Sequence, residues 1–482
     1  MADSSQFVLG GDLAGKPVSQ GLRLANRHGL VAGATGTGKT VTLQHLAEAF
    51  SDAGVAVFAA DVKGDLCGLG AAGNPQGKVA ERIAGMPWLN HRPQAYPVTL
   101  WDIHGQSGHP LRTTLSEMGP LLLGNLLELN DSQQAALYAA FKVADREGLL
   151  LLDIKDLKAL LGHLKDNPQV LGEDAALMTS GSTQALLRRL ATLEQQGAEA
   201  LFGEPALQLE DLLHPAADGR GRIHLLDASR LVHEAPKVYA TFLLWLLAEL
   251  FEQLPERGDA DKPLLALFFD EAHLLFSGTP KALQDRLEQV VRLIRSKGVG
   301  VYFVTQSPGD LPDDVLAQLG LRIQHGLRAF TAKEQKSLRA VADGFRPNPA
   351  FDTLAVLTEL GIGEALVGTL EEKGTPAMVE RVLIAPPQSR IGPLNETERA
   401  ALIAVSPLVG RYDKPIDRES AYEMLMARKG EAAEPPTAAQ KEEESLADKA
   451  GEFLQSAAGQ AIKSAVRQGG RAAGPRGGGG GG

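Results

Sequence analysis

The sequence predicts an α/β fold with a mainly parallel sheet, a helical insertion and a flexible C-terminal tail. Three observations predict it. Short apolar segments alternate with segments of helical periodicity in residues 1–118, and this alternation returns after residue 213. Between these two parts, leucine and alanine recur at helical spacing with few β-branched runs. Residues 431–482 are charged at first and then rich in glycine, which suits a linker and tail rather than a packed core.

The first strands of the sheet are predicted near the N-terminus. The run HGLVAGA, residues 28–34, is a short apolar segment that ends in glycine, as expected of a buried strand. Residues 39–54 place apolar side chains at helical spacing, and Gly54 suits the end of that helix. VAVFAAD (55–61) and YPVTLWDI (96–103) are the next predicted strands. Strand, loop, helix and strand in this order start a parallel sheet.

Strands and helices alternate again after the insertion. The predicted strands are RIHLLDAS (222–229), LLALFF (264–269), VGVYFVTQ (299–306) and LRIQHGLR (321–328). The predicted helices are residues 236–254, 280–298, 311–320 and 331–345, and residues 363–386 form a hairpin that turns near Lys373–Gly374. We therefore divide the chain into two parts of one core (1–118 and 214–385), the insertion (119–213), an extension packing on the core (386–430), and a linker, helix and tail (431–482).

The composition is that of an ordinary globular chain. The formal net charge is −11, so no basic surface covers the whole molecule. Cys67 is the single cysteine, which excludes an internal disulfide and a zinc cluster built on cysteines. The most apolar helical run, residues 238–251, is too short to span a bilayer and contains Glu249. With no secretory signal at the start, we expect a soluble cytoplasmic protein without a membrane partner.

The stretch GATGTGKT has the pattern and setting of a phosphate-binding loop, because it follows a predicted strand and opens a predicted helix. Its glycines let backbone N–H groups converge on phosphate oxygens, and the helix adds the positive end of its dipole. Lys39 would reach the β- and γ-phosphates of ATP, and Thr40 would offer its hydroxyl to Mg²⁺. The alternative is a glycine-rich turn with an unrelated lysine. The predicted nucleotide-binding residues are Gly33, Ala34, Thr35, Gly36, Thr37, Gly38, Lys39, Thr40 and Val41.

A buried strand ending in two acids supplies the carboxylates that such a site needs. Asp270 and Glu271 follow the apolar run before them, and ligands bind at the carboxyl ends of parallel strands. Asp270 would hold Mg²⁺ through water, and Glu271 would polarise the attacking water as a catalytic residue. The alternative is a strand that ends in a solvated acidic turn.

Polar residues end two further strands of the predicted sheet. Gln306 would emerge beside Asp270 if their strands are neighbours, where its amide could bond the γ-phosphate or the water. That order of elements is typical of ATPases with a catalytic glutamate. Asp61 would orient the water or a partner residue, and Lys63 would reach a neighbouring subunit. Gln306 as a loop cap, and Asp61 with Lys63 as an ordinary polar turn, are the alternatives.

Several motifs together resemble the HerA-like branch of the HerA/FtsK ATPases. They are VAGATGTGKTVTLQ, DVKGDLCGL, FFDEAHLLF, GVGVYFVTQSPGDLPDDVLAQLG and LRAFTAKEQKSLRAVADGF, and the resemblance extends over most of residues 6–430. SPLVGRYDKPIDRESAYEML is similar to the C-terminal signature of a bacterial subfamily in that branch. The resemblance implies a RecA-like P-loop NTPase core in ring hexamers, with ATP at subunit interfaces and double-stranded DNA as the substrate of the better-known members.

The resemblance also implies an arginine that reaches the neighbouring subunit's γ-phosphate and stabilises charge in the transition state. Arg295, just before the predicted strand that ends at Gln306, is the best match, and Arg328 is the second. The alternative for Arg295 is a cation favoured by the C-terminal end of a helix.

Two differences from known ATPases argue against a nuclease partnership and against an RNA helicase. Members of the branch that pump DNA carry an N-terminal β-barrel that docks a nuclease, and the roughly 30 residues before the phosphate loop are too few for one. The letters DEAH suggest an RNA helicase, but no second sheet of the required size and no Ser-Ala-Thr motif follow them.

Three functions remain after these exclusions. The first is an ATP-hydrolysing ring motor that moves or remodels double-stranded DNA. The second is an ATP-dependent switch or remodeller that acts on a protein partner, with the helical insertion recognising that partner. The third is a nucleotide-binding scaffold without turnover, which Glu271 argues against, because a scaffold has no need of that carboxylate.

Overall fold

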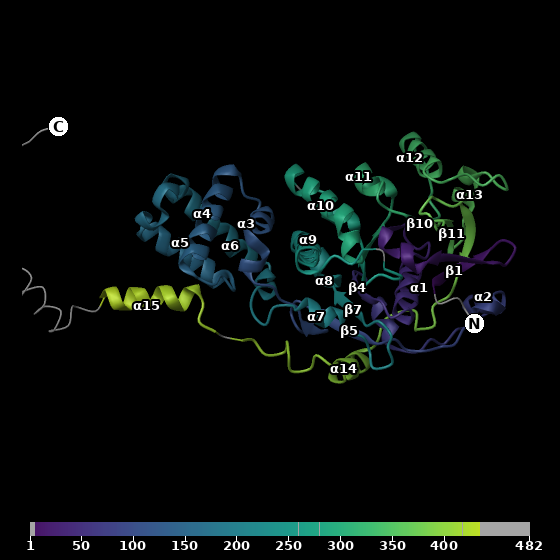
Figure 1. Ribbon diagram of the computed structural model, residues 1–482, viewed down its shortest axis with the longest axis horizontal. Helices are drawn as coiled ribbons and strands as arrows, with labels where there is room; N and C mark the ends of the chain where they lie inside the picture. The colour runs from purple at the N-terminus through teal and green to yellow at the C-terminus, as the bar shows by residue number, and fades with distance from the viewer. Residues whose placement is uncertain (1–4, 259, 279, 417, 434–482) are drawn as a thin grey trace, which may run out of the picture. The chain divides into compact units, whose positions relative to one another are not determined.

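One twelve-stranded sheet organises the structure. The computed structural model describes residues 5–433 except 259, 279 and 417, and the chain divides into a unit of Met1–Ala421 and a second unit from Tyr422 onward. The strands run across the sheet in the order β2-β1-β12-β11-β10-β3-β9-β8-β4-β7-β5-β6. Figure 1 labels β4, β7 and β5 in one part of this sheet and β10, β11 and β1 in the other. Their bounds are β1 (Gln6–Asp12), β2 (Pro17–Gly21), β3 (Gly29–Ala32), β4 (Ala56–Asp61), β5 (Val98–Asp102), β6 (His109–Pro110), β7 (Ile223–Asp227), β8 (Leu265–Phe269), β9 (Val299–Thr305), β10 (Leu321–His325), β11 (Glu364–Gly368) and β12 (Glu380–Ile384).

The sheet is parallel from β10 to β6 and antiparallel from β10 to β2. This confirms the predicted α/β class with a mainly parallel sheet. The predicted hairpin is β11 and β12, and Gly374 takes a φ of 78° in the connection between them. The sequence did not predict β1 and β2, which extend the sheet through the pairing of β1 with β12.

Fifteen α-helices are described. Their bounds are α1 (Lys39–Asp52), α2 (Lys78–Ala84), α3 (Leu115–Leu126), α4 (Asp131–Glu147), α5 (Ile154–Asp166), α6 (Ser180–Gln195), α7 (Leu209–Leu213), α8 (Ser229–Glu234), α9 (Pro236–Gln253), α10 (Lys281–Ile294), α11 (Asp313–Leu316), α12 (Ala332–Asp343), α13 (Thr353–Glu359), α14 (Glu396–Ala404) and α15 (Ala421–Ala433). None of the described helices is both long and apolar enough to cross a membrane.

Aromatic side chains join helix α1 to the strands of the sheet. Phe50 of α1, Phe268 of β8 and Tyr302 of β9 are fully buried, and the rings of Phe268 and Tyr302 stack with centroids 4.9 Å apart. Phe50 lies 5.4 Å from Tyr302 between centroids. Rings in such contact add about 0.5–1.5 kcal/mol per pair beyond the area they bury. This cluster fixes the strands whose ends carry the candidate site.

The chain between β6 and β7 is helical. Helices α3, α4 and α5 each begin at a capping box, with Thr114, Asn130 and Asp153 as the caps, which satisfies N–H groups at each helix start. Helices α3 to α6 pack on one another, and α3 also contacts α9 (Figure 1). The boundaries 119 and 213 stay predictions, and the structure has α3 beginning at Leu115.

The segment after β12 lies against the core within the first unit. Leu394, Leu402 and Ile403 pack on the same buried cluster as Phe50. Farther on, the Tyr412 hydroxyl donates to Asp211 at 2.5 Å, which ties this segment to α7. The predicted helix at 451–469 and the glycine-rich tail lie outside the described residues.

Candidate functional site

Three adjacent strands end at the candidate site. Strand β9 lies between β3 and β8, with Ala32 opposite Thr305 and Phe269 opposite Phe303. All three strands are parallel, so their carboxyl ends share one edge of the sheet. The phosphate loop, Gln306 and the pair Asp270–Glu271 therefore follow neighbouring strands, which meets the condition under which Gln306 was expected beside Asp270.

The backbone angles of the phosphate loop favour glycine at three positions, and close packing reinforces this at Gly33. Gly33, Gly36 and Gly38 have φ values of 153°, 79° and 113°, which side-chain-bearing residues rarely adopt. A Cβ atom on Gly33 would lie 2.5 Å from the Cβ of His325. The positive φ values therefore favour glycine at all three positions, and at Gly33 the close approach of His325 also leaves no room for a Cβ atom.

Backbone hydrogen bonds from three other segments hold the phosphate loop. Gly33 N–H donates to Thr305 O at 3.3 Å, and Ala34 N–H donates to Gly326 O at 3.1 Å. The Thr37 carbonyl accepts from a third segment, the loop before β11. Six N–H groups of the loop and first helical turn donate to no other described residue: those of Thr35, Gly36, Gly38, Lys39, Thr40 and Val41. Such a set of N–H groups at a helix start fits the oxygens of a phosphate chain.

Lys39 is buried within its own loop. Its ammonium donates to Gly33 O at 2.5 Å and to Ala34 O at 3.1 Å. Burial lowers the pKa of Lys39 and nearby Lys63 lowers it further, while Asp270 and Glu271 act in the opposite direction. The structure thus gathers Lys39, Lys63, Asp270 and Glu271 within electrostatic range of one another.

Asp270 stands at the end of buried strand β8, and burial raises its pKa to about 6. Its main-chain carbonyl accepts a hydrogen bond from the Tyr239 hydroxyl at 2.6 Å, and its Oδ1 accepts from Glu271 N–H at 2.9 Å. The carboxylate is mostly ionised at pH 7. Together with the partly buried hydroxyl of Thr40, it offers the hard oxygen donors that Mg²⁺ prefers.

Glu271 has a strained backbone and an unsatisfied carboxylate oxygen. Its φ of 48° and ψ of 47° lie in the left-handed region, which costs a non-glycine residue about 1–2 kcal/mol. Its Oε2 is buried and accepts no hydrogen bond from a described residue. His273 Nδ1 lies 3.3 Å from that oxygen, an ion-pair distance without hydrogen-bond geometry. Strain and an orphaned acceptor at one residue are typical of functional sites.

Three other predicted residues are exposed on this edge. Gln306 directly follows β9, Arg328 follows β10 by three positions, and Lys63 follows β4 by two. No described residue forms a hydrogen bond with the side chain of Gln306 or Arg328. Val41 is partly buried in the first turn of α1.

Arg295 lies at the opposite edge of the sheet. It follows α10 and precedes β9, whose seven residues span about 20 Å before the phosphate-loop edge is reached. Asn26 Nδ2 donates to its carbonyl at 3.3 Å, and its charge helps to lower the pKa of buried His28, after burial itself. Arg295 therefore cannot reach the phosphate loop of its own chain, whereas Arg328 shares an edge with that loop.

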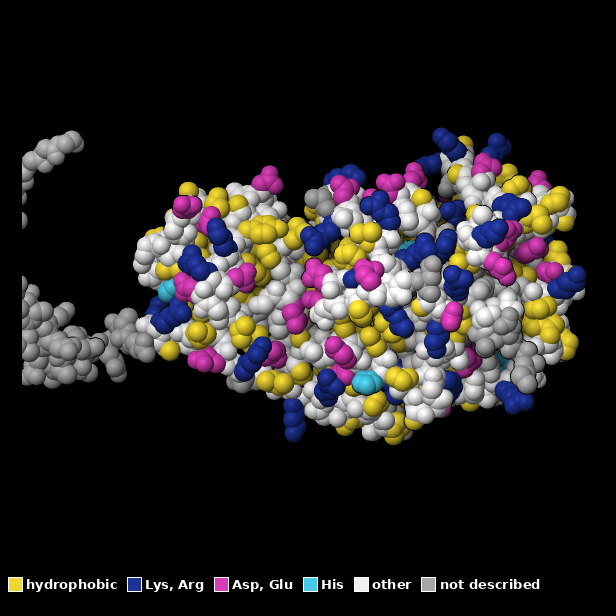
Figure 2. Space-filling view, viewed as in Figure 1, with side chains coloured by type: hydrophobic (Ala, Val, Ile, Leu, Met, Phe, Trp, Pro, Cys, Tyr) yellow, Lys and Arg dark blue, Asp and Glu magenta, His cyan; other side chains and the backbone are white. Residues whose placement is uncertain are grey.

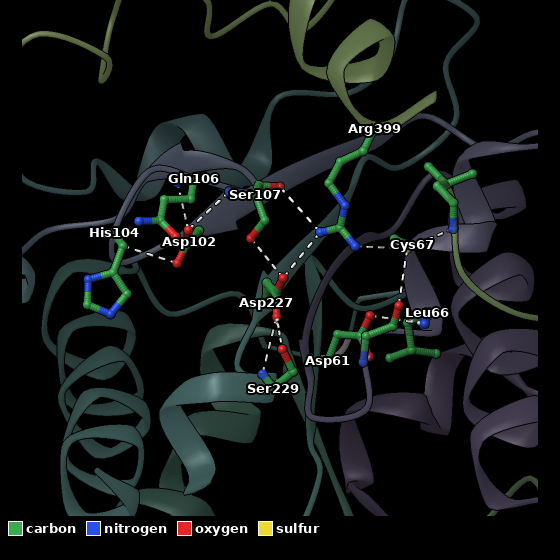
Figure 3. A network of polar contacts seen from close by, with 12 residues as sticks. Asp61, Leu66, Cys67, Asp102, His104, Gln106, Ser107, Asp227, Ser229 and Arg399 are labelled. Atoms are coloured by element: carbon green, nitrogen blue, oxygen red, sulfur yellow. Dashed lines mark hydrogen bonds and ion pairs between the residues drawn. The ribbon is translucent and has the colours of Figure 1, made fainter. Parts of the chain in front are cut away.

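Asp61 belongs to a separate polar network at the ends of β4, β7 and β5 (Figure 3). Its Oδ1 accepts from Gly64 N–H at 2.8 Å and Asp65 N–H at 3.2 Å, and its Oδ2 accepts from Leu66 N–H at 3.0 Å. Burial, then the Asp65 charge, raises the pKa of Asp61 to about 7. These contacts are those of the polar turn that the sequence left as the alternative.

Sequence reasoning missed two residues that support the site. Buried His325 ends β10 behind the phosphate loop, with Nε2 2.9 Å from Thr42 Oγ1 and Nδ1 2.9 Å from Glu364 O. Tyr239 supports the Asp270 backbone from α9. The only signal for His325 was a polar residue at a strand end, and Tyr239 looked like any buried residue of an apolar helix.

Comparison with solved structures identifies proteins that share this fold. The bacterial conjugative coupling protein TrwB aligns with a TM-score of 0.54 and 15% identity over 81% of this chain and 91% of that chain. VirB4 of Thermoanaerobacter pseudethanolicus aligns with a TM-score of 0.50 and 17% identity over 83% and 99%. TrwB in complex with ADP and Mg²⁺ gives 0.50 and 15% over 80% and 90%. The chain thus has the RecA-like P-loop fold that the resemblance implied.

A comparison with curated proteins gives no match. The model of the family described as helicase HerA-like C-terminal matches residues 7–474, nearly the whole chain. The motifs that carried the resemblance in the sequence lie inside this match. The chain therefore belongs to the helicase HerA-like C-terminal family.

Proposed function

We propose that this protein hydrolyses ATP with Mg²⁺ at the site formed by β3, β9 and β8. One observation carries the proposal: the phosphate loop, Gln306 and the pair Asp270–Glu271 follow three adjacent parallel strands. The structure of TrwB with ADP and Mg²⁺ supports it, since that protein shares this fold.

Each residue of the site has a distinct part in the proposed reaction. The N–H groups of the phosphate loop and Lys39 bind the phosphate chain and neutralise its charge. Thr40 and Asp270 would hold Mg²⁺, which supplies further charge neutralisation at the β- and γ-phosphates. Glu271 accepts the proton of the attacking water through its unsatisfied Oε2. Gln306 orients that water or the γ-phosphate.

The proposed active unit is a ring of six copies, in which Arg295 of one copy completes the site of its neighbour. The position of Arg295 supports this arrangement, because it lies about 20 Å from its own phosphate loop at the other edge of the sheet. An arginine supplied in trans typically raises turnover by about 10³–10⁵.

Double-stranded DNA is the proposed substrate of the motor. The family and the coupling protein among its structural neighbours support this substrate. Among the described residues on the face in Figure 2, basic and acidic side chains are interspersed, which matches the net charge of −11. DNA contact is therefore assigned to the interior of the ring rather than to this face.

Substitution of Glu271 by glutamine tests hydrolysis. Turnover is expected to fall about 100-fold or more, because the amide cannot accept the proton, while nucleotide affinity stays within about twofold. Glu372→Gln, an exposed change in the β11–β12 connection, is the matched control and should retain full turnover. Equal turnover of Glu271→Gln and wild type would refute the assignment.

The second candidate function is an ATP-dependent remodeller with a protein partner. The mixed charges of Figure 2 favour it, since a face without a basic area offers more to a protein than to DNA. ATPase assays with and without duplex DNA separate the two. Stimulation of several-fold supports the DNA motor, whereas no DNA response together with a stable protein complex supports the remodeller.

A further inference from the structure

A cavity at the edge opposite the phosphate loop is lined by arginines. It has a volume of about 430 Å³, and Arg27, Arg292, Arg295, Arg322 and Arg346 line it. Among the described residues that line it, none is aspartate or glutamate. In a chain with 59 acidic and 48 basic residues, this separation of charge requires an explanation.

The arginines come from separate elements, so one helix end does not explain them. Arg292 and Arg295 lie near the C-terminal end of α10, where the helix dipole favours cations. Arg27 ends the 3₁₀ helix before β3, Arg322 lies in β10, and Arg346 follows α12. The dipole of α10 therefore accounts for two of the five cations and leaves three without a cause.

Most of this positive charge is not neutralised by carboxylates. Arg322 donates to the carbonyls of Gly344 at 3.0 Å and Leu316 at 3.1 Å, which fix the guanidinium without cancelling its charge. Arg27 has a buried Nε that donates to no described residue. Among the other four arginines, Arg295 set aside, Arg346 alone forms an ion pair with a described residue, Glu371 at 2.9 Å.

We propose that this cavity binds the phosphate chain of a small polyanion, such as a diphosphate or triphosphate. Guanidinium groups bond phosphate oxygens in pairs, and several of them together match a ligand with several charges. The volume lies within the range of ligand pockets in proteins. The phosphate chain comes either from free oligophosphate or from a nucleotide held by a neighbouring copy, and only the second source rests on the proposed function.

Calorimetry with inorganic tripolyphosphate on the full-length Lys39→Ala protein tests the proposal, because the phosphate loop is then disabled. We expect one site per chain, weakened about tenfold or more when Arg292→Ala is added. Arg292 is exposed, so its loss should leave folding intact, which thermal unfolding verifies. Arg286→Ala is the matched control, since Arg286 lies on the same helix outside the cavity.

The outcomes separate the two sources of phosphate. Binding to Lys39→Ala that depends on Arg292 identifies free oligophosphate. The neighbour's nucleotide is identified by two results together. Tripolyphosphate does not bind the Lys39→Ala protein, and Arg292→Ala protein loses nucleotide affinity tenfold only at concentrations where copies associate. The proposal is overturned if Arg292→Ala changes neither tripolyphosphate binding nor nucleotide affinity, or if it weakens only the binding of duplex DNA. The turnover of Glu271→Gln tests the proposed hydrolysis and is independent of these binding measurements.

Discussion

Burial sets the charge of Asp270, and thereby the pH range in which the candidate site can hold Mg²⁺. Its raised pKa of about 6 means that the folded protein keeps a proton there at a pH where the unfolded chain has lost it. Ionisation of Asp270 therefore lowers stability as pH rises from about 4 to 6. The proposed binding of Mg²⁺ needs the ionised form of Asp270 and therefore strengthens as pH rises.

The affinity for Mg²⁺–nucleotide is expected to fall about tenfold between pH 7 and pH 5, because the ionised fraction of Asp270 falls by that factor. Titration of a fluorescent ATP analogue at each pH measures it. Asp270→Asn should bind weakly with a much flatter profile, and titration of the ligand itself is common to both proteins. If the affinity of Asp270→Asn also changed tenfold between pH 7 and pH 5, Asp270 would not be the cause of the pH dependence.

Glu271 keeps a left-handed backbone that glycine would adopt without strain. Glu271→Gly should therefore unfold with a free energy about 1 kcal/mol higher than Glu271→Ala, which retains the strain. Urea denaturation measures the difference. Both proteins lose the carboxylate and should lose turnover, so equal stability of the two would show that the backbone relaxes without glycine.

At the scale of elements, an arginine of α14 forms an ion pair with the end of β7, in addition to the apolar packing of that helix on the core (Figure 3). Arg399 lies 3.2 Å from Asp227 Oδ2, and both side chains are about one-fifth exposed. Burial opposes ionisation of Asp227, yet hydrogen bonds from Ser229 and Ser107 and the Arg399 charge together lower its pKa. The end of β7 thus depends on a residue 172 positions later.

Arg399→Ala should lower the free energy of unfolding by about 1–2 kcal/mol, because Asp227 loses its partly buried counterion. Arg390→Ala is the control from the same segment. Its pair with Glu398 is more than one-third exposed and should contribute less than about 0.5 kcal/mol. Similar losses in the two variants, measured by urea denaturation, would contradict this account.

The sequence predicted the elements whose signal is local. Strands β3, β4, β8 and β9 were found because each is a short apolar run, and the ends of three of them gave the candidate site. Strands β1 and β2 were missed, because β1 joins the sheet by pairing with β12, which lies far along the chain. The polar turn held by Asp61 and the support from His325 likewise depend on contacts that local spacing does not encode.

At the scale of the whole molecule, the phosphate loop and Arg295 occupy opposite edges of one sheet. Arg295→Ala should reduce turnover about 1000-fold or more with nucleotide binding nearly intact. Mixing it with Lys39→Ala should restore activity, since random pairing gives about a quarter of the interfaces one intact half from each protein. Steady-state ATPase assays of the mixture measure the recovery.

Each variant alone is the control for that mixture and should stay inactive. Full turnover of Arg295→Ala by itself would remove this residue from the reaction. No recovery on mixing, with both variants assembled, would contradict the assignment of Arg295 to the neighbour's site, and Arg328 would become the candidate arginine.

The order of strands also has a consequence for biosynthesis. Strand β3 is made within the first 32 residues, but within the described sheet it pairs with β9 and β10, and the loop after it is further held by Gly326 and Gly363. A ribosome must therefore add more than 320 further residues before the earliest motif of the chain can close around a ligand. Nucleotide can assist the folding of the finished protein, but not that of a nascent chain that still lacks these segments.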